Sequence, residues 1–313
     1  MVHKPEWFKN DQVFVSYART VGINKDGNTL FTVEASTGKR TGEIDNKVAL
    51  DIDALFEGGS TDTSRWIDSA NFGYAVPTYY DDRYTAALEE LLRTPAFDGF
   101  EARSLASLIK DKLITRQPGH GSPSQDLRGG TVPYIKVSDI RAGQVNINPS
   151  TLVPEPVAER FWRGKESRIK PFDLITPIRA SNNIGEFAII MPGQERMVLT
   201  KEVLILRAAE DAPVDNFYLL WALTLKVVRD QWKRVVFMQT NRDDVGDRYL
   251  ELQIPWPTSK DAAEKISAEF REYYQGLDKL RTRFVSKLED GGLHHVFLGD
   301  GALPEEADGP GSD

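Results

Sequence analysis

Four polar segments carry the side chains of this sequence that could recognise a nucleic acid. They span residues 116–131, 136–139, 179–183 and 239–242, and each adjoins a stretch rich in strand-forming residues. Arginine, asparagine and glutamine have the donor and acceptor geometry that matches base edges in the major groove. Lysine, serine and threonine commonly hold phosphate oxygens. The alternative interpretation of each segment is an ordinary solvated turn.

The sequence contains none of the common catalytic motifs. It has no glycine-rich phosphate loop, no GxGxxG or HExxH pattern, and no serine in a GxSxG context. The absence of cysteine excludes disulfides, thiolate zinc sites and cysteine nucleophiles, and four histidines are too few to favour a histidine-rich metal site. Asp243, Asp244 and Asp247 could bind Mg²⁺, but a solvated loop is the simpler interpretation because no nuclease motif accompanies them. We therefore expect no chemistry from this chain alone.

Size and composition predict a folded protein of about two domains. Hydrophobic residues make up 40% of the 313-residue chain, which is enough for sizeable cores. The longest apolar runs fall short of the ~18 residues that a membrane span requires. No basic start followed by an apolar stretch marks a secretory signal. We expect a soluble, cytoplasmic protein with no membrane contact.

The net charge of −8 is divided unevenly along the sequence. Lysine and arginine against aspartate and glutamate give −6 for residues 1–99, +3 for 100–256 and −5 for 257–313. A local positive region matters more for binding a polyanion than the sum of all charges does. The middle of the chain therefore permits nucleic-acid binding without requiring it.

Before residue 100 the pattern indicates short strands followed by helices. An apolar strand at 13–18, a tight turn at 25–28 and a second strand at 30–33 predict a hairpin. From Asp81, apolar residues spaced three and four apart predict a helix, and a shorter helix is expected after Ser104.

Residues 113–257 have the pattern of a β-rich domain with long loops. Glycine, proline, serine and asparagine separate short strand-forming segments at 132–137, 144–147, 173–178, 186–190 and 198–206. Helices are predicted at 157–161 and 216–233, the second with Asp215 as its N-terminal cap. Apolar residues cover most of the circumference of this second helix, which indicates packing on two sides.

A long helix is predicted after Thr258 or Ser259, running to about residue 289. Its apolar residues follow a spacing close to the heptad repeat: Ile266, Phe270, Tyr273, Leu277, Leu280, Phe284 and Leu288. Such a seam predicts a helical partner, either a second copy or another protein. The alternative is a helix that lies on its own domain. Residues 291–313, rich in glycine, proline and acid, are expected to form a disordered tail.

Four segments of the β-rich domain occur in an order that is found in a known family. They are 129–145 (GGTVPYIKVSDIRAGQV), 171–190 (PFDLITPIRASNNIGEFAII), 199–208 (LTKEVLILRA) and 237–257, which ends in Pro-Trp-Pro. The long helix follows them. This ordered set resembles a target-recognition domain and spacer helix of type I restriction–modification specificity subunits, over roughly residues 100–290.

Two features depart from that family. A full specificity subunit has two recognition domains and two spacer helices, whereas this sequence has one of each. Thr258-Ser259-Lys260 replaces the Glu-Gln that often follows the Pro-x-Pro. The first departure suggests a half-subunit that dimerises through its helix or reads a single, non-bipartite sequence.

The amino-terminal segment has a resemblance of its own. Residues 13–31, with Thr37-Gly38-Lys39 and Asp51-Ile52-Asp53, are similar to the extreme carboxyl end of N6-adenine DNA methyltransferase subunits, although Asn24 stands where an aspartate is usual. The catalytic core of such an enzyme is absent from this sequence. The resemblance implies a separate methyltransferase, which would bind S-adenosylmethionine and on which this segment would dock.

The resemblance and the side-chain chemistry together assign roles to residues of the four polar segments. Base reading is expected from Arg179, Asn182, Asn183, Gln239, Asn241 and Arg242. Phosphate or sugar contacts are expected from Lys136, Ser138, Ser181 and Thr240. The other residues expected on the DNA face are Arg116, His120 and Arg128. The expected helix interface consists of Ile266, Phe270, Tyr273, Leu277, Leu280 and Phe284.

The sequence thus predicts an α+β protein with a docking segment at 1–99, a DNA target-recognition domain at 100–257, a coiled-coil-forming spacer helix at 258–290 and the tail. We expect a non-catalytic specificity subunit with no cofactor or metal of its own. It would bind double-stranded DNA and direct a separate N6-adenine methyltransferase, and a nuclease subunit is a further candidate partner, in a restriction–modification or phage-defence system. The alternative is an assembly protein of a defence complex that reads no sequence.

Overall fold

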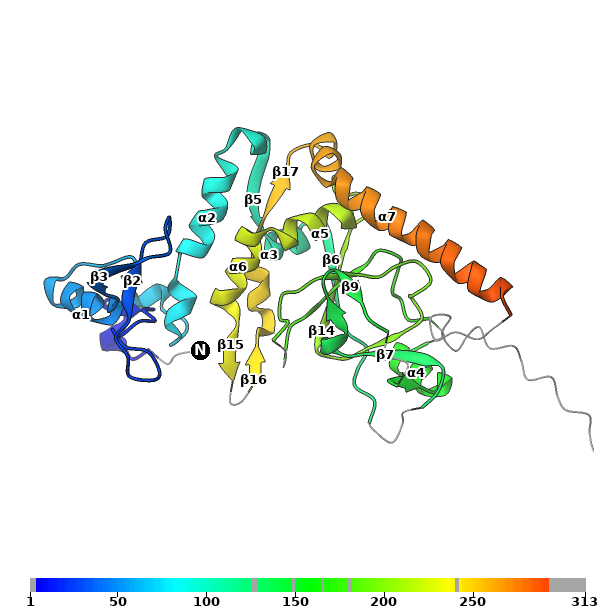
Figure 1. Cartoon of the computed structure of the whole chain (residues 1–313), viewed down its shortest axis with the longest axis horizontal. Coiled ribbons are helices and arrows are strands. Elements are labelled where there is room, and N and C mark those ends of the chain that lie inside the picture. The colour runs from blue at the N-terminus through cyan, green and yellow to red at the C-terminus, as the bar shows by residue number, and fades with distance from the viewer. Residues whose placement is uncertain are drawn as a thin grey trace, which may run out of the picture. The chain divides into compact units, whose positions relative to one another are not determined.

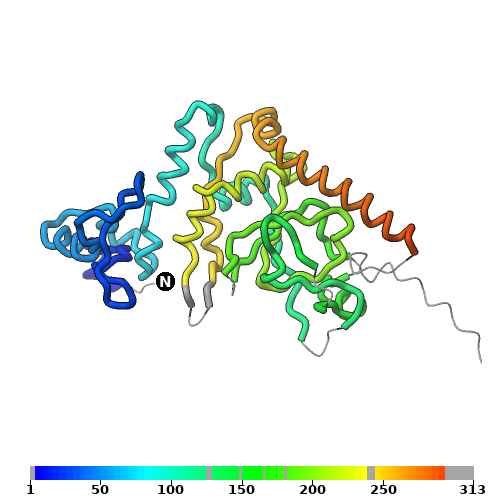
Figure 2. The backbone as a smooth tube through the Cα atoms, viewed as in Figure 1, coloured from blue at the N-terminus to red at the C-terminus, as the bar shows by residue number. Residues whose placement is uncertain are grey.

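The computed structural model describes residues 4–124, 129–147, 150–164, 166–179, 182–239 and 242–292, with backbone alone at 238, 239, 242 and 243. The chain divides into two units, the first ending at Arg83 and the second beginning at Tyr84 (Figure 2). The predicted boundary at 99/100 lies further along the chain. The difference arises because helix α2 (Arg83–Leu92) buries Leu88 completely in the core of the second unit.

The first unit contains two separate two-stranded sheets and one α-helix. Its elements are η1 (Glu6–Phe8), β1 (Gln12–Ser16), β2 (Phe31–Val33), β3 (Arg40–Ile44), α1 (Lys47–Glu57), β4 (Ser64–Asp68), η2 (Ser69–Asn71) and η3 (Pro77–Tyr80). Strand β1 pairs antiparallel with β4, and β2 pairs antiparallel with β3. The predicted hairpin between 13–18 and 30–33 is therefore wrong. The aromatic rings of Phe14 and Trp66 pack edge to face across β1 and β4, so the first strand takes a partner from far along the chain.

Helix α1 occupies a segment for which the sequence pattern predicted strands. Asn46 caps it by accepting a hydrogen bond from the backbone N–H of Ala49 (3.1 Å), and Gly58 ends it with a φ of +69°. The helix buries only Asp51 and Ala54. The buried apolar cluster of the first unit consists of Val15, Tyr17, Ile67 and Tyr80. Much of the apolar surface of α1 is consequently exposed.

The second unit holds the predicted strands in small, mostly antiparallel sheets. The larger sheet has the order β12-β11-β14-β6, formed by β6 (Ile114–Pro118), β11 (Leu174–Pro177), β12 (Ala188–Ile189) and β14 (Val203–Ala208). A second sheet places β7 (Val132–Ile135) between β10 (Leu152–Val153) and β13 (Val198–Leu199). The remaining pairs are β5 (Phe100–Ser104) with β17 (Gln253–Pro257), β8 (Ile140–Arg141) with β9 (Gln144–Val145), and β15 (Phe237–Gln239) with β16 (Arg242–Asp244). Each strand segment predicted between 132 and 206 contains a strand, so the α+β class is confirmed.

Helices surround these sheets (Figure 1). They are α2, α3 (Leu105–Lys110), α4 (Glu155–Trp162), α5 (Asn216–Thr224), α6 (Lys226–Val235) and α7 (Lys260–Asp290), with the short 3₁₀ helices η4 (Pro95–Phe97), η6 (Val137–Asp139) and η7 (Gly246–Glu251). The helix predicted at 216–233 is two helices, because Leu225 has a ψ of 135° and breaks the helical path. Asp215 caps α5 as predicted by accepting from the backbone N–H of Tyr218 (2.9 Å).

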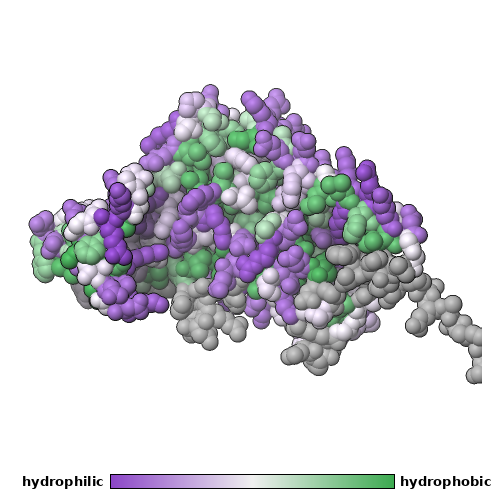
Figure 3. All heavy atoms as spheres, in the orientation of Figure 1, coloured by the Kyte–Doolittle hydropathy of each residue, from purple (hydrophilic) through white to green (hydrophobic). Residues whose placement is uncertain are grey.

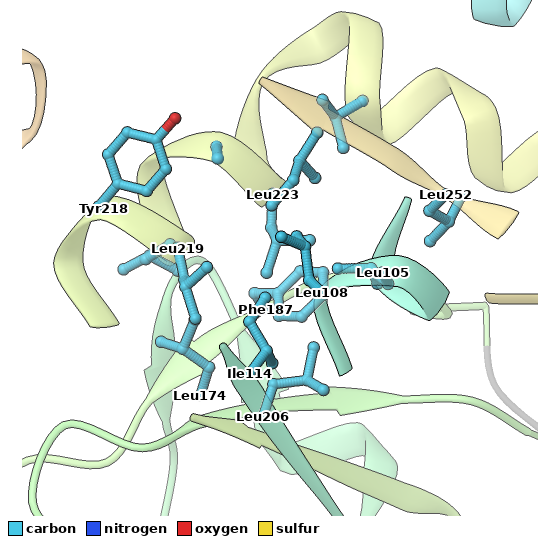
Figure 4. Packing of buried hydrophobic residues seen from close by; sticks show 14 of the residues in the cluster. Leu105, Leu108, Ile114, Leu174, Phe187, Leu206, Tyr218, Leu219, Leu223 and Leu252 are labelled. Atoms are coloured by element: carbon cyan, nitrogen blue, oxygen red, sulfur yellow. The ribbon is translucent and has the colours of Figure 1, made fainter. Parts of the chain in front are cut away.

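The main core of the second unit lies where α3 and α5 pack on the larger sheet (Figure 4). The figure shows leucines of α3 and α5 meeting Leu174 of β11 and Leu206 of β14. Tyr218 is fully buried, and its hydroxyl donates a hydrogen bond to the backbone oxygen of Pro255 (2.7 Å). This bond ties α5 to β17, the strand that leads into α7.

Helix α7 begins where the sequence predicted. Ser259 caps it by accepting from the backbone N–H of Ala262 (3.3 Å), and its first half packs on α5. The hydroxyl of Tyr274 reaches the backbone oxygen of Gly143 (3.3 Å), which fixes the helix to the β8–β9 turn. No described helix is both long enough and apolar enough to cross a membrane.

The predicted seam of α7 divides into two parts. Ile266, Phe270 and Leu277 pack against the main core of their own unit, as the alternative interpretation expected. The other part is exposed and consists of Tyr273, Leu280 and Phe284. Apolar atoms are accordingly visible along α7 in Figure 3. The first part of the predicted interface is thus used within its own unit, whereas the second part exposes apolar surface.

Candidate nucleic-acid interface

A cleft of about 570 Å³ in the second unit is lined by residues of the first and third polar segments and by Asp244. Asp244 belongs to β16, the strand that begins with Arg242 of the fourth segment. Its charged and polar lining residues are Arg116, Gln117, Arg179, Lys201, Asp244, Asp247 and Tyr249. Three basic side chains thus share a cleft with two carboxylates. On the face drawn in Figure 3, hydrophilic side chains gather over α6.

Arg116 lies within strand β6 rather than in the loop that the sequence predicted to begin there. Its Nη1 donates to Oδ1 of Asp247 (2.9 Å) and to the hydroxyl of Tyr249. Its guanidinium carbon also lies 5.8 Å from the centre of the Tyr249 ring. The hydrogen bonds to Tyr249 and Asp247 raise the pKa of Arg116 further above its ordinary value, so the guanidinium is permanently charged.

Tyr249 supports this arrangement from below the surface. Its side chain is almost fully buried, and burial raises the pKa of its hydroxyl even though the Arg116 guanidinium lowers it. The phenol is therefore neutral at physiological pH. It accepts the hydrogen bond from Nη1 of Arg116 and holds the guanidinium in one place.

Arg179 follows β11 and is held by the β15–β16 hairpin. Its Nε donates to Oδ2 of Asp244 (2.5 Å), and the two residues also form a backbone bridge. The backbone N–H of Val245 donates to the oxygen of Ile178 (3.2 Å). Arg248 in turn donates to the backbone oxygens of Asp244 and Val235, which secures the base of the hairpin.

The fourth polar segment includes the last residue of β15 and the first residue of β16. In the register of β15 and β16, Gln239 lies opposite Arg242. Their backbone positions are described, whereas the predicted readers and holders Thr240 and Asn241 lie outside the described residues. The backbone bridge between Arg179 and Asp244 brings the hairpin next to the third segment.

Asn183 does not have the role that the sequence predicted. Its side chain is 1% exposed, and its Nδ2 donates to the backbone oxygens of Val137 (3.2 Å) and Ile140 (3.1 Å). It therefore cannot reach a base edge in this conformation, and its assignment as a base reader is corrected to a structural one. Its hydrogen bonds attach the third polar segment to the second, which carries exposed Ser138 and half-buried Lys136.

His120 is also a structural residue rather than a DNA contact. Its Nδ1 accepts from the backbone N–H of Leu199 (2.9 Å), so its Nε2 carries the proton and donates to the oxygen of Ser167 (2.8 Å). Burial lowers the pKa of the imidazole despite the bond to Ser167. Both ring nitrogens are used inside the fold, which corrects the prediction.

The other predicted residues divide between exposed and undescribed positions. Asn182 is exposed at the start of the turn after Arg179. Arg128 and Ser181 lie outside the described residues, so the structure leaves their roles as predictions. At Gln239 and Arg242 only the backbone is described.

Sequence reasoning missed Lys201, Asp247 and Tyr249 as residues of this cleft. Asp244 and Asp247 had been considered only as ligands of Mg²⁺, but each receives an arginine instead. Among the described residues, no group of three or more His, Asp or Glu side chains is placed to share a metal ion. The partners Arg116 and Asp247 are 131 residues apart in the sequence, so no local spacing could have revealed them.

No protein-family model and no curated protein matches the sequence. Solved structures do match. The S subunit of a type I restriction–modification system from M. genitalium matches with a TM-score of 0.40 and 16% identity, over 64% of this chain and 47% of its own. The HsdS subunit from Thermoanaerobacter tengcongensis matches with a TM-score of 0.37 and 15% identity, over 64% of this chain and 44% of its own.

A chain from a structure that describes complex assembly and conformational transition of the type I restriction–modification system matches with a TM-score of 0.39 and 14% identity. The match covers 78% of this chain and 55% of that one. The present chain therefore spans about half the length of the solved structures that it matches.

The geometry of the cleft is suited to recognition by hydrogen bonding. Arg179 uses Nε for Asp244 and Arg116 uses Nη1 for Asp247, and a guanidinium has five N–H donors in all. Within the part of the chain that the structure describes, these contacts leave further donors of both side chains for a ligand. A guanidinium held in one orientation can bind a guanine edge or a phosphate with two parallel hydrogen bonds.

Proposed function

We propose that this chain is a sequence-specific recognition subunit for double-stranded DNA, which directs a separate N6-adenine methyltransferase in a restriction–modification or phage-defence system. A nuclease subunit is a further proposed partner. The observation that carries the proposal is the cleft in which Arg116, Arg179 and Lys201 meet. These residues come from three separate parts of the chain, and two of them belong to segments that the sequence alone marks as readers.

In this proposal the side chains around the cleft divide the work of recognition. The base readers are Arg179, Asn182, Gln239, Asn241 and Arg242, and the phosphate or sugar holders are Lys136, Ser138, Ser181 and Thr240. Arg116 and Arg128 belong to the same face, and exposed Lys201 joins the phosphate holders. Asn183 and His120 support this surface from inside the fold.

The first unit would dock on the methyltransferase through helix α1. This helix exposes Ile52, Leu55 and Phe56 on one side, and Phe56 is 85% exposed. Contiguous apolar surface of this kind commonly marks a protein-binding site. The small apolar cluster of this unit, described above, supports the same assignment, because a partner would add the burial that the unit lacks.

The experiment that tests the proposal is selection of bound DNA from randomised duplexes, with the full chain alone and with the proposed methyltransferase partner. A salt concentration of about 150 mM suppresses weak non-specific attraction. Enrichment of one short motif, particularly one containing adenine, is the expected result. Binding without any motif would contradict sequence recognition.

Variants then assign individual roles. Arg179→Ala is expected to cost about 1–3 kcal/mol and to relax one position of the motif, because it removes a base reader. Lys201→Ala should weaken binding to all sequences alike and lower the salt slope by about one, because it removes a phosphate contact. Arg93→Ala, just after the end of α2, is the control, since this arginine is exposed and does not line the cleft. If Arg179→Ala and Asn182→Ala both leave the motif unchanged, the third segment is removed from the base-reading set.

The second candidate function is that of an assembly protein without sequence readout. The exposed apolar residues of α1 and of the second half of α7 favour it. Tyr273→Asp with Leu280→Asp is the test for α7, because both side chains are exposed and their replacement spares the core that Leu277 helps to form. If DNA selection finds no motif while these changes abolish a dimer or partner complex in light scattering, the assembly function is favoured.

A further inference from the structure

We infer that Asp247 and Asp244 are specificity-determining residues of the DNA interface, because each restrains an arginine that would otherwise bind the phosphates of any sequence. This inference rests on the proposed function and concerns the same cleft. It gives the two carboxylates a role distinct from reading bases or holding phosphates. They weaken binding to DNA that lacks the recognised motif more than binding to DNA that carries it.

The two ion pairs place both arginines at the surface of the cleft, where DNA could reach them. The side chain of Arg116 is 40% exposed and that of Arg179 is 54% exposed. Neither guanidinium is withdrawn into the core. With Lys201 they give the cleft three positive charges, which Asp244 and Asp247 reduce to a net charge of +1.

The carboxylates distinguish between the two kinds of DNA contact. A phosphate carries a negative charge, so an arginine that binds it must leave its aspartate or bring the aspartate close to a like charge. The edge of guanine carries no net charge, and it takes two N–H donors through N7 and O6. Because the arginine has five donors, it can contact guanine while it keeps its aspartate. The repulsion therefore acts on non-specific binding more strongly than on specific binding.

The two aspartates act in different ways because their exposure differs. The side chain of Asp247 is 79% exposed and stands at the rim, where its charge faces an approaching duplex. The side chain of Asp244 is 12% exposed, and its residue also bridges Arg179 through the backbone. Asp247 therefore acts chiefly by repulsion, whereas Asp244 chiefly fixes the orientation of Arg179.

Tyr249 makes the effect of Asp247 separable from the placement of Arg116. The Tyr249 hydroxyl accepts from the same Nη1 that pairs with Asp247. When Asp247 is changed to asparagine, the guanidinium is still held by the phenol, and asparagine keeps an oxygen at the same place. The variant thus removes a negative charge with little change of geometry.

The test compares the full-length wild-type chain with Asp247→Asn, in the presence of its methyltransferase. Equilibrium dissociation constants are measured for a duplex carrying the selected motif and for a random-sequence duplex, over a series of salt concentrations. Asp111→Asn is the matched control, because Asp111 is likewise an exposed aspartate paired with an arginine in the second unit, but lies outside the cleft. Thermal melting verifies that each variant is folded.

Asp247→Asn is expected to bind the random-sequence duplex about three to ten times more tightly, with a salt slope steeper by up to about one. Binding to the motif should change less, so the ratio between the two affinities should fall, while Asp111→Asn leaves both unchanged. Asp244→Asn should instead relax one position of the motif, because Arg179 loses its orientation.

Two results would overturn the inference, and they can be told apart. If the wild type selects its motif but Asp247→Asn leaves random-sequence affinity and salt slope unchanged, the restraint by Asp247 is refuted and the proposed function stands. If the wild type binds neither duplex, with or without the methyltransferase, the proposed function fails and the inference fails with it.

Discussion

The two units of this protein differ in how much apolar surface each buries. In the second unit, leucines of α3 and α5 are fully buried against the larger sheet, and Tyr218 closes the core. In the first unit the apolar cluster is small, and Phe56 on α1 stands in solvent. Because apolar burial is the main stabilising contribution to folding, the second unit is stable through its own core. The first unit depends more on polar contacts and has apolar surface left for a partner.

The polar contacts of the first unit centre on Asp51, which is 1% exposed. Its carboxylate accepts hydrogen bonds from the hydroxyls of Ser16 (2.6 Å), Thr63 (2.9 Å) and Thr61. Burial alone would raise the pKa of this carboxyl, but the hydroxyl donors outweigh it and lower the pKa. A network of short polar side chains thus joins α1 to β1 and to the segment before β4.

The comparison predicts the largest loss of stability from truncation in the core of the second unit. Leu219→Ala removes a fully buried side chain and is expected to lower the free energy of unfolding of this unit by about 2–5 kcal/mol. Chemical denaturation followed by tryptophan fluorescence measures it. Leu50→Ala on exposed α1 is the matched control, with an expected change within about 0.5 kcal/mol. Equal losses in the two variants would refute the contrast between the units.

The next largest effect is expected from Asp51→Asn in the first unit. This change should lower the free energy of unfolding by about 2–3 kcal/mol, because a buried charged acceptor of several hydroxyls is lost. The pKa of Asp51 is lowered in the folded state, so the unfolded chain binds the proton more readily. The stabilisation is therefore complete above the ordinary pKa of about 3.8 and is lost as the pH falls through the folded pKa.

Acid denaturation of the first unit measures this dependence. Asp53→Asn is the control, since Asp53 is exposed and lies two residues after Asp51 on the same helix. Asp51→Asn should flatten the acid limb of the curve and Asp53→Asn should not. An acid limb that persists in Asp51→Asn would assign the effect to another carboxyl.

A smaller effect is expected at His120 in the second unit. His120→Phe leaves the backbone N–H of Leu199 without its acceptor and should cost about 1–2 kcal/mol. Because burial lowers the pKa of His120, the unfolded chain takes up its proton first as the pH falls below about 6.5. The wild type should lose stability there down to the folded pKa. Urea unfolding is measured between about pH 5 and about pH 7, on either side of the ordinary pKa of histidine. The free energy of unfolding should depend less on pH in the variant than in the wild type.

The smallest effect on stability, within about 0.5 kcal/mol, is expected from Phe56→Ser on α1. This side chain is almost fully exposed, so its removal costs the isolated chain little. Binding of the proposed methyltransferase partner should nevertheless weaken strongly, as measured by calorimetric titration. Exposed Leu280→Ser on α7 is the control for loss of an apolar side chain elsewhere. Undiminished methyltransferase binding in Phe56→Ser would locate the docking surface outside α1.

Local patterns predicted the helices and most strands of the second unit well. The caps Ser259, Asp215 and Ser104 act as the sequence indicates, because a cap is recognised within a few residues of the helix that it begins. The break at Leu225 escaped prediction because apolar residues continue through it. The pairing of β1 with β4 escaped because a nearer turn offered a local alternative.

The candidate site was predicted only in part, and for a similar physical reason. Residue type assigned Arg179 to the expected base readers and Arg116 to the expected DNA face, and both line the cleft. It misassigned Asn183 and His120, because their hydrogen-bond partners are backbone groups from distant segments. It also missed Tyr249, which has no role until β6 is folded beside it.

The pairing of β5 with β17 has a consequence for how such a protein could change its target. Phe100 lies directly opposite Pro257, so the chain enters and leaves the intervening 150-odd residues at neighbouring strands, about 4.8 Å apart. The chain segment between β5 and β17 is therefore closed at its base by this pair of strands. A recombination event with one end in the codons of β5 and the other in those of β17 would replace this segment, while α2 and α7 keep their spacing. Under the proposed function, the recognised sequence would then be inherited with this segment, independently of the surfaces proposed to bind partners.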